Sequence, residues 1–380
     1  MILRELELRH FRNLGIQELH FPPEGVAVIG DNAQGKTNLL EAIYYLESFR
    51  SFRGAGDSEL TAFNEDVFHL KGYVDGDRPA TISAGFDRKR KKKKVSVDGS
   101  DAVRISGALG RLGAVVFSPA DVDLVSGGPG LRRRFLDIVL SLNRKGYVES
   151  LTAYRKVLAQ RNAALKSHAA PLAVRAWDEA LIDSGATVTC LRHEWAAAWA
   201  GPFTDYCTAI SRNDPVGMAY RPDLGAPGDC PASEDGAFGT EKDAVRDRFR
   251  VRLDASWETD MRRGATAPGP HRDELLLTIA SSGRSLPARA YGSGGQRRTA
   301  ALALRLTEAA TIRRHRGAEP MLLLDDAFAE LDDVRSGRIM ELLREEGTGQ
   351  VILTAPKESD VRQRGPSLPR WRIRRGVVEA

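Results

Sequence analysis

Residues Gly30 to Thr37 have the composition and spacing of a loop that binds the phosphates of a nucleotide. The segment reads Gly30-Asp31-Asn32-Ala33-Gln34-Gly35-Lys36-Thr37. Its glycines allow backbone N–H groups to curl around phosphate oxygens, and Lys36 brings a positive charge to the β- and γ-phosphates. The Thr37 hydroxyl is a ligand that Mg²⁺ accepts. We therefore predict that these residues bind a nucleotide, with Lys36 also acting in catalysis.

Two adjacent acids follow the apolar run Met321 to Leu324, where a buried strand is expected to end. Carboxylates at the end of such a strand are suited to a magnesium site beside a phosphate loop. We predict that Asp325 holds Mg²⁺, directly or through water, together with Thr37. Asp326 is then expected to orient or deprotonate the water that attacks the nucleotide.

A second glycine-rich segment, Ser293-Gly294-Gly295-Gln296, precedes a helix-forming stretch. A helix N-terminus attracts anions, but the phosphate loop already opens a helix of its own. We therefore predict that Ser293, Gly294, Gly295 and Gln296 contact the nucleotide of another copy of the chain. Asp332 stands seven residues beyond Asp325. This order of motifs resembles that of the ABC-type ATPases.

An ABC transporter ATPase subunit is the alternative interpretation, and spacing argues against it. Lys36 and Ser293 are 257 residues apart, whereas transporter ATPases keep these motifs much closer together. Transporter subunits also carry a Gln after the phosphate loop and a His after the last core strand. Here no Gln occurs between Gln34 and Gln160, and Thr354 stands where transporter subunits carry the His. The insertion is too short for the long coiled coil of chromosome-organising ATPases.

Further segments of the chain resemble the RecF family of bacterial recombination proteins. There are seven such segments: Leu8 to Asn13, Gly35 to Tyr44, Ser51 to Arg53, Phe117 to Pro119, Arg132 to Asp137, Gly269 to Asp273, and Leu322 to Asp326. They span nearly the whole chain in the family's order. One departure is Gly294, because the family usually has Gln after the signature serine.

The resemblance implies a head domain like that of Rad50, with ATP and Mg²⁺ as cofactors. It implies ATP-dependent homodimerisation, DNA binding and slow, DNA-dependent ATP hydrolysis that works as a switch in replication and repair. RecO and RecR are the implied partners, in loading recombinase at gaps or stalled forks. The same resemblance places the phosphate loop, Ser293, Asp325 and Asp326 at the ATP interface and makes Arg12 a further phosphate contact.

The elements that must position these residues follow from hydrophobic periodicity. Val26 to Ile29 predicts a buried strand before the phosphate loop, and the stripe Leu39, Leu40, Ile43 and Leu46 predicts a helix after it. Alternation between Phe68 and Val97 predicts an antiparallel meander. Residues 135–261 are mostly helical in pattern, and Gly and Pro residues predict a long loop over 213–239.

The predicted fold is therefore an α/β ATPase head of the P-loop, ABC type, with an antiparallel β subdomain. A mostly helical arm is inserted into it. We place the split head at residues 1–130 and 265–380 and the insertion at 131–264.

Positive charge is concentrated in one run. The chain has 56 Lys and Arg against 51 Asp and Glu. The run comprises Arg88, Lys89, Arg90, Lys91, Lys92, Lys93 and Lys94, and without it 49 cations face 51 acids. On a hairpin connection it is expected to bind DNA phosphates, and a solvated loop is the alternative. Arg132 to Arg134 open a helix, where a phosphate or acidic partner is a further expectation.

Composition excludes several classes of protein. No apolar run approaches the roughly 18 residues of a membrane helix, and the N-terminal residues lack the apolar core of a signal peptide. The cysteines Cys190, Cys207 and Cys230 have no spacing typical of a zinc site or a disulfide framework. We expect a soluble cytoplasmic protein without a membrane partner.

Overall fold

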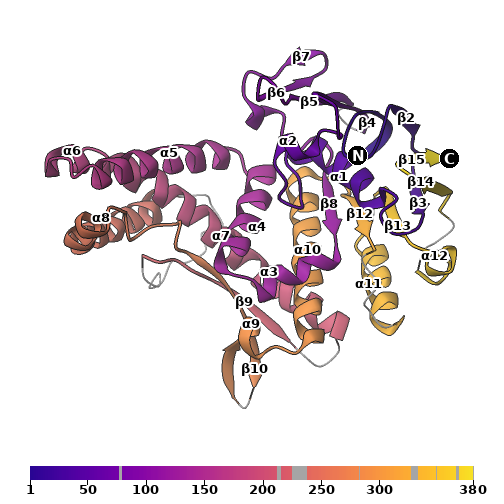
Figure 1. Cartoon of the computed structure of the whole chain (residues 1–380). Coiled ribbons are helices and arrows are strands. Elements are labelled where there is room, and N and C mark those ends of the chain that lie inside the picture. The colour runs from indigo at the N-terminus through magenta and orange to yellow at the C-terminus, as the bar shows by residue number, and fades with distance from the viewer. Residues whose placement is uncertain are drawn as a thin grey trace. The chain divides into compact units, whose positions relative to one another are not determined.

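The computed structural model describes residues 1–76, 79–211, 215–224, 238–281, 283–326, 333–347, 349–364 and 368–379. The chain divides into two compact units (Figure 1). The head unit consists of Met1–Val122, Ala209–Ser211 and Ala301–Ala380, and the arm unit of Asp123–Thr208 and Arg212–Ala300. The predicted domain bounds stay a prediction, and the two units differ from them mainly over residues 265–300, which lie in the arm unit.

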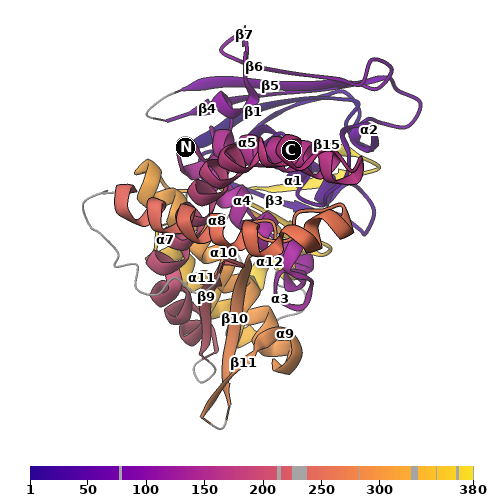
Figure 2. The same ribbon diagram turned by 90° about the vertical axis from the view of Figure 1, so that its left-hand side faces the viewer.

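The head unit contains an antiparallel sheet with the strand order β2-β1-β4-β5-β6-β7. Figure 2 shows its long strands side by side near the top of the view. The alternating burial of β4 and β5 is the pattern of a sheet with one face on the core. The strands are β1 (Ile2–Arg9), β2 (Gln17–His20), β4 (Val67–Asp75), β5 (Ala80–Asp87), β6 (Lys92–Val97) and β7 (Ser100–Asp101).

A second sheet of the head unit is mostly parallel, in the order β15-β14-β3-β13-β12-β8. Only β15 runs antiparallel to its neighbour. Its inner strands are continuous apolar runs because both of their faces are covered. The strands are β3 (Gly25–Ile29), β8 (Ala114–Phe117), β12 (Met321–Asp325), β13 (Val351–Ala355), β14 (Arg370–Arg374) and β15 (Val377–Glu379).

Helix α1 (Lys36–Ser48) shares one core with residues of both sheets. From Leu39 to Ser48 every residue of the helix is buried. Phe11 and Tyr45 stack edgewise against Phe68, with ring centroids 5.3 and 5.4 Å from the Phe68 centroid. The rest of the head unit includes α2 (Asp57–Leu60), α11 (Asp333–Glu345), α12 (Glu358–Arg364) and 3₁₀ turns at Ile105–Gly107 and Pro119–Asp121. The predicted fold class, an α/β ATPase head with an antiparallel β subdomain, is confirmed.

The arm unit is mostly helical. Its long helices α5 and α8 run side by side in Figure 1 and are joined by buried Arg161, which donates to Asp260 at 2.8 Å. The helices are α3 (Val122–Ser126), α4 (Pro129–Asn143), α5 (Tyr147–Lys166), α6 (Pro171–Arg175), α7 (Asp178–Ser211), α8 (Phe238–Arg263) and α9 (Ala288–Tyr291). Helix α10 (Gly294–Arg316) begins in this unit and continues in the head unit.

A three-stranded antiparallel sheet completes the arm unit, with β10 (Glu274–Ser281) between β9 (Val216–Arg221) and β11 (Arg284–Pro287). The prediction of one long loop over 213–239 is wrong at β9, where pairing with β10 orders the six residues between Pro215 and Pro222, and at the first residues of α8. Residues 225–237 of that predicted loop lie outside the described residues. Among the helices that the structure describes, none is long and apolar enough to span a membrane.

Candidate nucleotide-binding site

The phosphate loop connects β3 directly to α1, as predicted. Gly35 adopts φ +114°, a conformation that strains other residues, and its missing Cβ leaves room for the Asn13 side chain. The Lys36 Nζ donates to the carbonyl oxygens of Gly30 (2.7 Å) and Asp31 (3.2 Å). The ammonium group therefore lies within the curve of the loop, where a phosphate would meet it.

Two segments distant in sequence hold the loop in place. The Asn13 amide donates to the Gln34 carbonyl oxygen at 3.2 Å and accepts from the Asn38 amide at 2.7 Å. The turn between β14 and β15 donates from the Gly376 N–H to the Gln34 carbonyl oxygen (2.8 Å) and from the Arg375 N–H to Gln34 Oε1 (2.6 Å). These contacts fix the position of Gln34 in the loop, and the sequence of the loop alone predicts neither of the two supporting segments.

Asp325 reaches the phosphate loop from the end of β12. The Thr37 hydroxyl lies 2.8 Å from Asp325 Oδ1 and donates to this carboxylate. Thr354, at the matching position of β13, lies 3.1 Å from the same oxygen and is almost fully buried. Parallel pairing of β12 with β13 places Asp325 opposite Thr354, so the sheet register decides this meeting.

Asp326 has an unusual backbone for a residue with a side chain, with φ +44°. Its N–H donates to the Thr354 hydroxyl at 3.1 Å, which fixes the turn. Among the described residues its buried Oδ1 has no hydrogen-bond partner. Burial raises the pKa of both Asp325 and Asp326, while the Thr37 hydrogen bond opposes this at Asp325 and the Lys36 charge opposes it at Asp326.

These side chains fit a magnesium ion. Mg²⁺ prefers oxygen ligands and keeps several waters, and the Thr37 hydroxyl and Asp325 carboxylate are such ligands in contact with one another. Asp326 directly follows Asp325, and its buried Oδ1 has no hydrogen-bond partner among the described residues. A buried oxygen of this kind normally contacts a cation or a water molecule. The donor set therefore agrees with the predicted roles of Thr37 and Asp325.

Arg12 lies in this region, but its guanidinium is engaged by protein. It donates to both carboxylate oxygens of Glu41 at 2.9 and 3.0 Å, and Glu41 is fully buried on α1. Ser51 also donates to Glu41, and Arg53 lies 3.7 Å from it. A buried carboxylate needs such partners, so this network explains the acid in the middle of α1. Arg12 as a phosphate contact stays a prediction.

Ser293 and Gln296 form a reciprocal cap at the start of α10. Ser293 Oγ accepts from the Gln296 N–H at 3.1 Å, and Gln296 Oε1 accepts from the Ser293 N–H at 2.8 Å. This arrangement is the capping box, which leaves other N–H groups of the first helical turn available. Ser293 and Gly294 are exposed. Their contact with a second copy's nucleotide stays a prediction, and Asp332 lies outside the described residues.

Comparison with known proteins decides the family. A model described as the RecF/RecN/SMC N terminal domain matches residues 2–365. The DNA replication and repair protein RecF of Salinibacter ruber is 35% identical over 377 residues, covering 97% of this chain and 87% of the relative. The protein so named from Caldanaerobacter subterraneus subsp. tengcongensis is 34% identical over 374 residues, covering 95% and 96%. The chain belongs to the RecF family.

Solved structures agree with this RecF assignment. The structure of the recombination mediator protein RecF-ATP in the RecFOR pathway has a TM-score of 0.88 at 32% identity and covers 100% of this chain and 97% of its own. The Smc head domain of Pyrococcus furiosus, bound to the C-terminal domain of ScpA, has a TM-score of 0.54 at 17% identity, covering 100% and 95%. The Smc likeness shows the fold alone.

In this RecF family member the basic run is not a free loop throughout. Arg88 to Lys91 form the turn after β5, but Lys92, Lys93 and Lys94 belong to β6. Lys93 is held by Asp57 at 2.9 Å and by the Phe49 carbonyl oxygen at 2.7 Å. The other charged contacts pair Lys89 with Asp66, Arg90 with Asp87 and Lys94 with Asp101, and Arg88 donates to backbone carbonyls. Lys91 and Lys92 are exposed, without a partner among the described residues.

Arg132 and Arg133 make contacts within the arm unit, and the acidic partner of Arg132 is Glu274 of the same chain. Arg132 is buried, forms a two-point ion pair with Glu274 on β10 and also donates to carbonyls of the segment before α4. Arg133 donates to the Asp273 carbonyl oxygen at 2.8 Å. The sequence alone cannot distinguish an arginine that pairs within its own chain from an arginine that binds a ligand.

The segment Gly269 to Asp273 is a structural junction of the arm unit. Asp273 is fully buried and accepts from the Asp223 N–H at 2.8 Å, from Arg192 at 3.3 Å and from the Tyr220 hydroxyl. His271 Nδ1 lies 2.6 Å from the Tyr154 hydroxyl, and burial lowers the pKa of its imidazole. The segment therefore serves packing.

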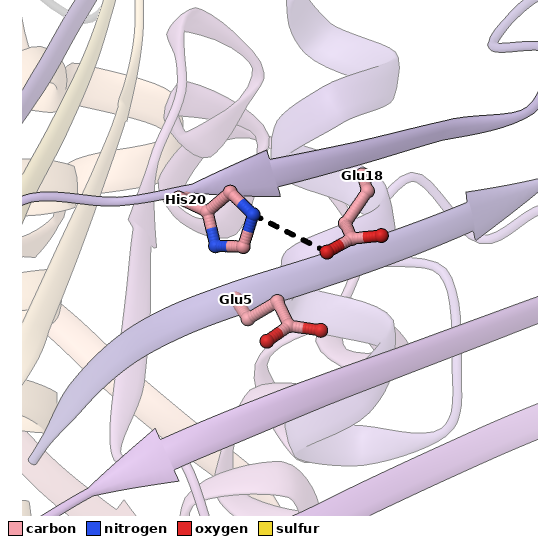
Figure 3. A group of neighbouring side chains, drawn as sticks. All are labelled: Glu5, Glu18 and His20. Carbon is pink, nitrogen blue, oxygen red and sulfur yellow. Dashed lines mark ion pairs between the residues drawn. The ribbon is translucent and has the colours of Figure 1, made fainter.

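Glu5, Glu18 and His20 form a group on the antiparallel sheet (Figure 3). One potential ligand atom from each lies within 4.8 Å of the others, and pairing of β1 with β2 sets Glu5 opposite His20. The spacing of the histidines in the sequence did not predict a metal-binding group here, because the three residues come together only through pairing of β1 with β2. The side chains are half-buried or exposed, and the contact of 3.2 Å between His20 and Glu18 accounts for their grouping without an ion.

Proposed function

We propose that this protein is an ATP-dependent DNA-binding switch of replication and recombinational repair in the cytoplasm. ATP binds at Gly30 to Thr37 and brings two copies together, with Ser293 to Gln296 of one copy on the nucleotide of the other. The dimer holds DNA, and slow, DNA-dependent hydrolysis releases it. RecO and RecR are the proposed partners in loading recombinase at gaps.

The contact between Thr37 and Asp325 carries the nucleotide part of this proposal. The two residues are 288 positions apart in the chain, yet the hydroxyl and the carboxylate meet at 2.8 Å, and Thr37 directly follows Lys36 of the phosphate loop. Two separate motifs predicted from sequence thus converge on one point with the ligand types that a Mg²⁺–nucleotide complex requires. Solved RecF structures that contain ATP are similar in fold to this chain over 97% or more of both lengths.

Each polar group then has a defined task. Backbone N–H groups of the loop and the Lys36 ammonium bind and orient the phosphates, which the support from Asn13 and the β14–β15 turn makes possible without rearrangement. Mg²⁺, when bound, neutralises charge on the transferred phosphoryl group. Asp326 Oδ1 orients the attacking water and accepts its proton.

Several observations support DNA as the macromolecular ligand. The curated relatives are named DNA replication and repair proteins. Lys91 and Lys92 are exposed and have no partner among the described residues, so they place positive charge on the protein surface. An ABC transporter subunit is less well supported, because the relatives and the family model match nearly the whole chain. Thr354, where transporters carry His, contacts both Asp325 and Asp326 here.

DNA retention tests this function directly. Wild-type protein and Lys36→Arg are incubated with gapped, duplex and single-stranded DNA, each with and without ATP and Mg²⁺, and the bound fraction is measured by fluorescence anisotropy. We expect ATP to increase retention by the wild-type protein at least tenfold. Lys36→Arg should lose this increase, because a bulky planar guanidinium replaces the compact ammonium within a tight loop. Equal retention with and without ATP would overturn the switch.

A further inference from the structure

A pocket of about 830 Å³ lies on the outer side of the phosphate loop, within the head unit. Its wall includes Asp31 and Gln34 of the loop, Lys357 after β13, and Arg372, Arg374 and Arg375 at the end of β14. In Figure 1 the strands β14 and β3 that support it are adjacent, as their hydrogen-bonded pairing requires.

The pocket shares Gly30, Asp31 and Gln34 with the phosphate loop but excludes the charged groups of the cradle that is expected to bind the nucleotide's phosphates and Mg²⁺. Lys36, Thr37, Asp325 and Asp326 define that cradle, and none of them lines the pocket. Among the residues that the structure describes, no aromatic side chain lines it either, so this lining offers no surface on which a base can stack. Its chemistry therefore suits phosphate groups better than an adenine ring or an unpaired base.

The strand pattern gathers positive charge at this pocket. Strand β14 alternates, with Trp371 and Ile373 buried and the arginines between and beside them exposed. Arg370, the first of these, is paired with Glu358 and does not line the pocket. For the Arg372 and Arg374 side chains, the described residues provide no hydrogen bond or ion pair.

The balance of charge at the pocket is positive. Of the described residues, four cationic side chains line it, against the acids Asp31 and Glu358, and Glu358 is paired with Arg370. Guanidinium groups held on a rigid strand bind phosphate oxygens at two points and lose little freedom in doing so. Arg375 is further fixed through its N–H, which donates to Gln34 of the phosphate loop at 2.6 Å.

We propose that the pocket formed by Arg372, Arg374, Arg375 and Lys357 binds phosphates of the DNA backbone. This proposal rests on the proposed DNA-binding function and adds a contact surface on the mostly parallel sheet, separate from the basic run on the antiparallel one. Such a contact is independent of base sequence and weakens as salt rises.

The test uses the full chain with the substitutions Arg372→Ser and Arg374→Ser combined. Affinity for a fluorescent duplex is measured with ATP present over a series of salt concentrations. Each lost phosphate contact flattens the slope of log affinity against log salt by about 0.9, so we expect a change of about 2 units. Arg370→Ser combined with Glu358→Gln is the matched control, because it removes a whole ion pair beside the pocket without leaving an unpaired acid in it, and its slope should be close to that of the wild type.

Two further measurements make the outcome decisive. The charge-preserving pair Arg372→Lys and Arg374→Lys should keep a slope near the wild-type value, which separates loss of charge from loss of fold. ATP affinity without DNA should be the same in all variants. A wild-type slope in the double serine variant overturns the proposal, as does a loss of ATP affinity without DNA, which would assign the pocket to the nucleotide. If the wild-type protein binds no DNA, the proposed function itself fails.

Discussion

At the scale of single residues, the two adjacent acids at the end of β12 are distinguished by their contacts. Asp325 accepts a hydrogen bond from the Thr37 hydroxyl, whereas Asp326 has a left-handed backbone (φ +44°) and, among the described residues, no partner for its buried Oδ1. Sequence alone predicted both acids and their different roles, because strand-end carboxylates beside a phosphate loop have few other uses. It could not predict Thr354 or Asn13 as supports, since each acts through a sheet register or a tertiary contact.

The division of labour between the two acids predicts different phenotypes. Asp325→Asn should weaken Mg²⁺-dependent nucleotide binding about tenfold or more, because a charged oxygen ligand is lost. Asp326→Asn should leave that binding within about twofold and lower ATP turnover by about 10²-fold or more, the size of a general-base effect. Fluorescent-nucleotide titration and phosphate release measure the two quantities. Equal losses of binding in both variants would show that the roles are not divided in this way.

Thr354 is expected to act by holding both acids. Thr354→Val keeps the volume of the side chain but removes the hydroxyl that accepts from the Asp326 N–H and contacts Asp325. Without this hydroxyl the Asp326 carboxylate is less well placed, so we expect kcat to fall about tenfold, equivalent to about 1.4 kcal/mol of activation free energy, with a smaller change in KM. Thr354→Ser should restore most of the rate. A valine variant with wild-type kcat would remove Thr354 from the account.

At the scale of elements, the hairpin of β5 and β6 shows why a charge run cannot be interpreted from composition alone. The meander and its turn signals were predictable from alternation. The sequence could not show that β6 begins within the run, nor that Lys93 turns back to Asp57. Of the seven cations predicted to bind DNA, Lys91 and Lys92 are the exposed ones for which the described residues supply no partner.

This difference within the hairpin predicts two outcomes. Lys91→Ser combined with Lys92→Ser should flatten the salt dependence of DNA affinity by up to about 2 units and leave thermal stability unchanged. Lys93→Ser should leave the salt slope nearly unchanged and lower the melting temperature, because Asp57 loses its ion pair and keeps only neutral hydrogen bonding from Tyr45 among the contacts described. Salt titrations and thermal denaturation separate the effects. An unchanged slope in the Lys91 and Lys92 variant would identify the run as a solvated turn.

At the scale of the whole molecule, the order of motifs along the chain was the strongest signal. Phosphate loop, Ser293 segment and strand-end acids predicted an ATPase head interrupted by an insertion, and the RecF comparisons cover 97% of the chain at 35% identity. Sequence periodicity could not place the limits of the two units, because α7 and α10 each pass from one unit into the other without a break in pattern.

The central claim is that nucleotide joins two copies of the chain through Ser293, and the mass of the protein in solution tests it most directly. Light scattering is recorded with and without ATP for the wild-type protein and for Ser293→Arg. We predict that ATP doubles the wild-type mass, while Ser293→Arg stays monomeric and binds ATP with nearly unchanged affinity. Ser293 is exposed in the single chain, so an arginine meets no buried neighbour, and loss of the Ser293 Oγ cap costs the fold about 1 kcal/mol. A Ser293→Arg protein that still dimerises normally with ATP would contradict the account.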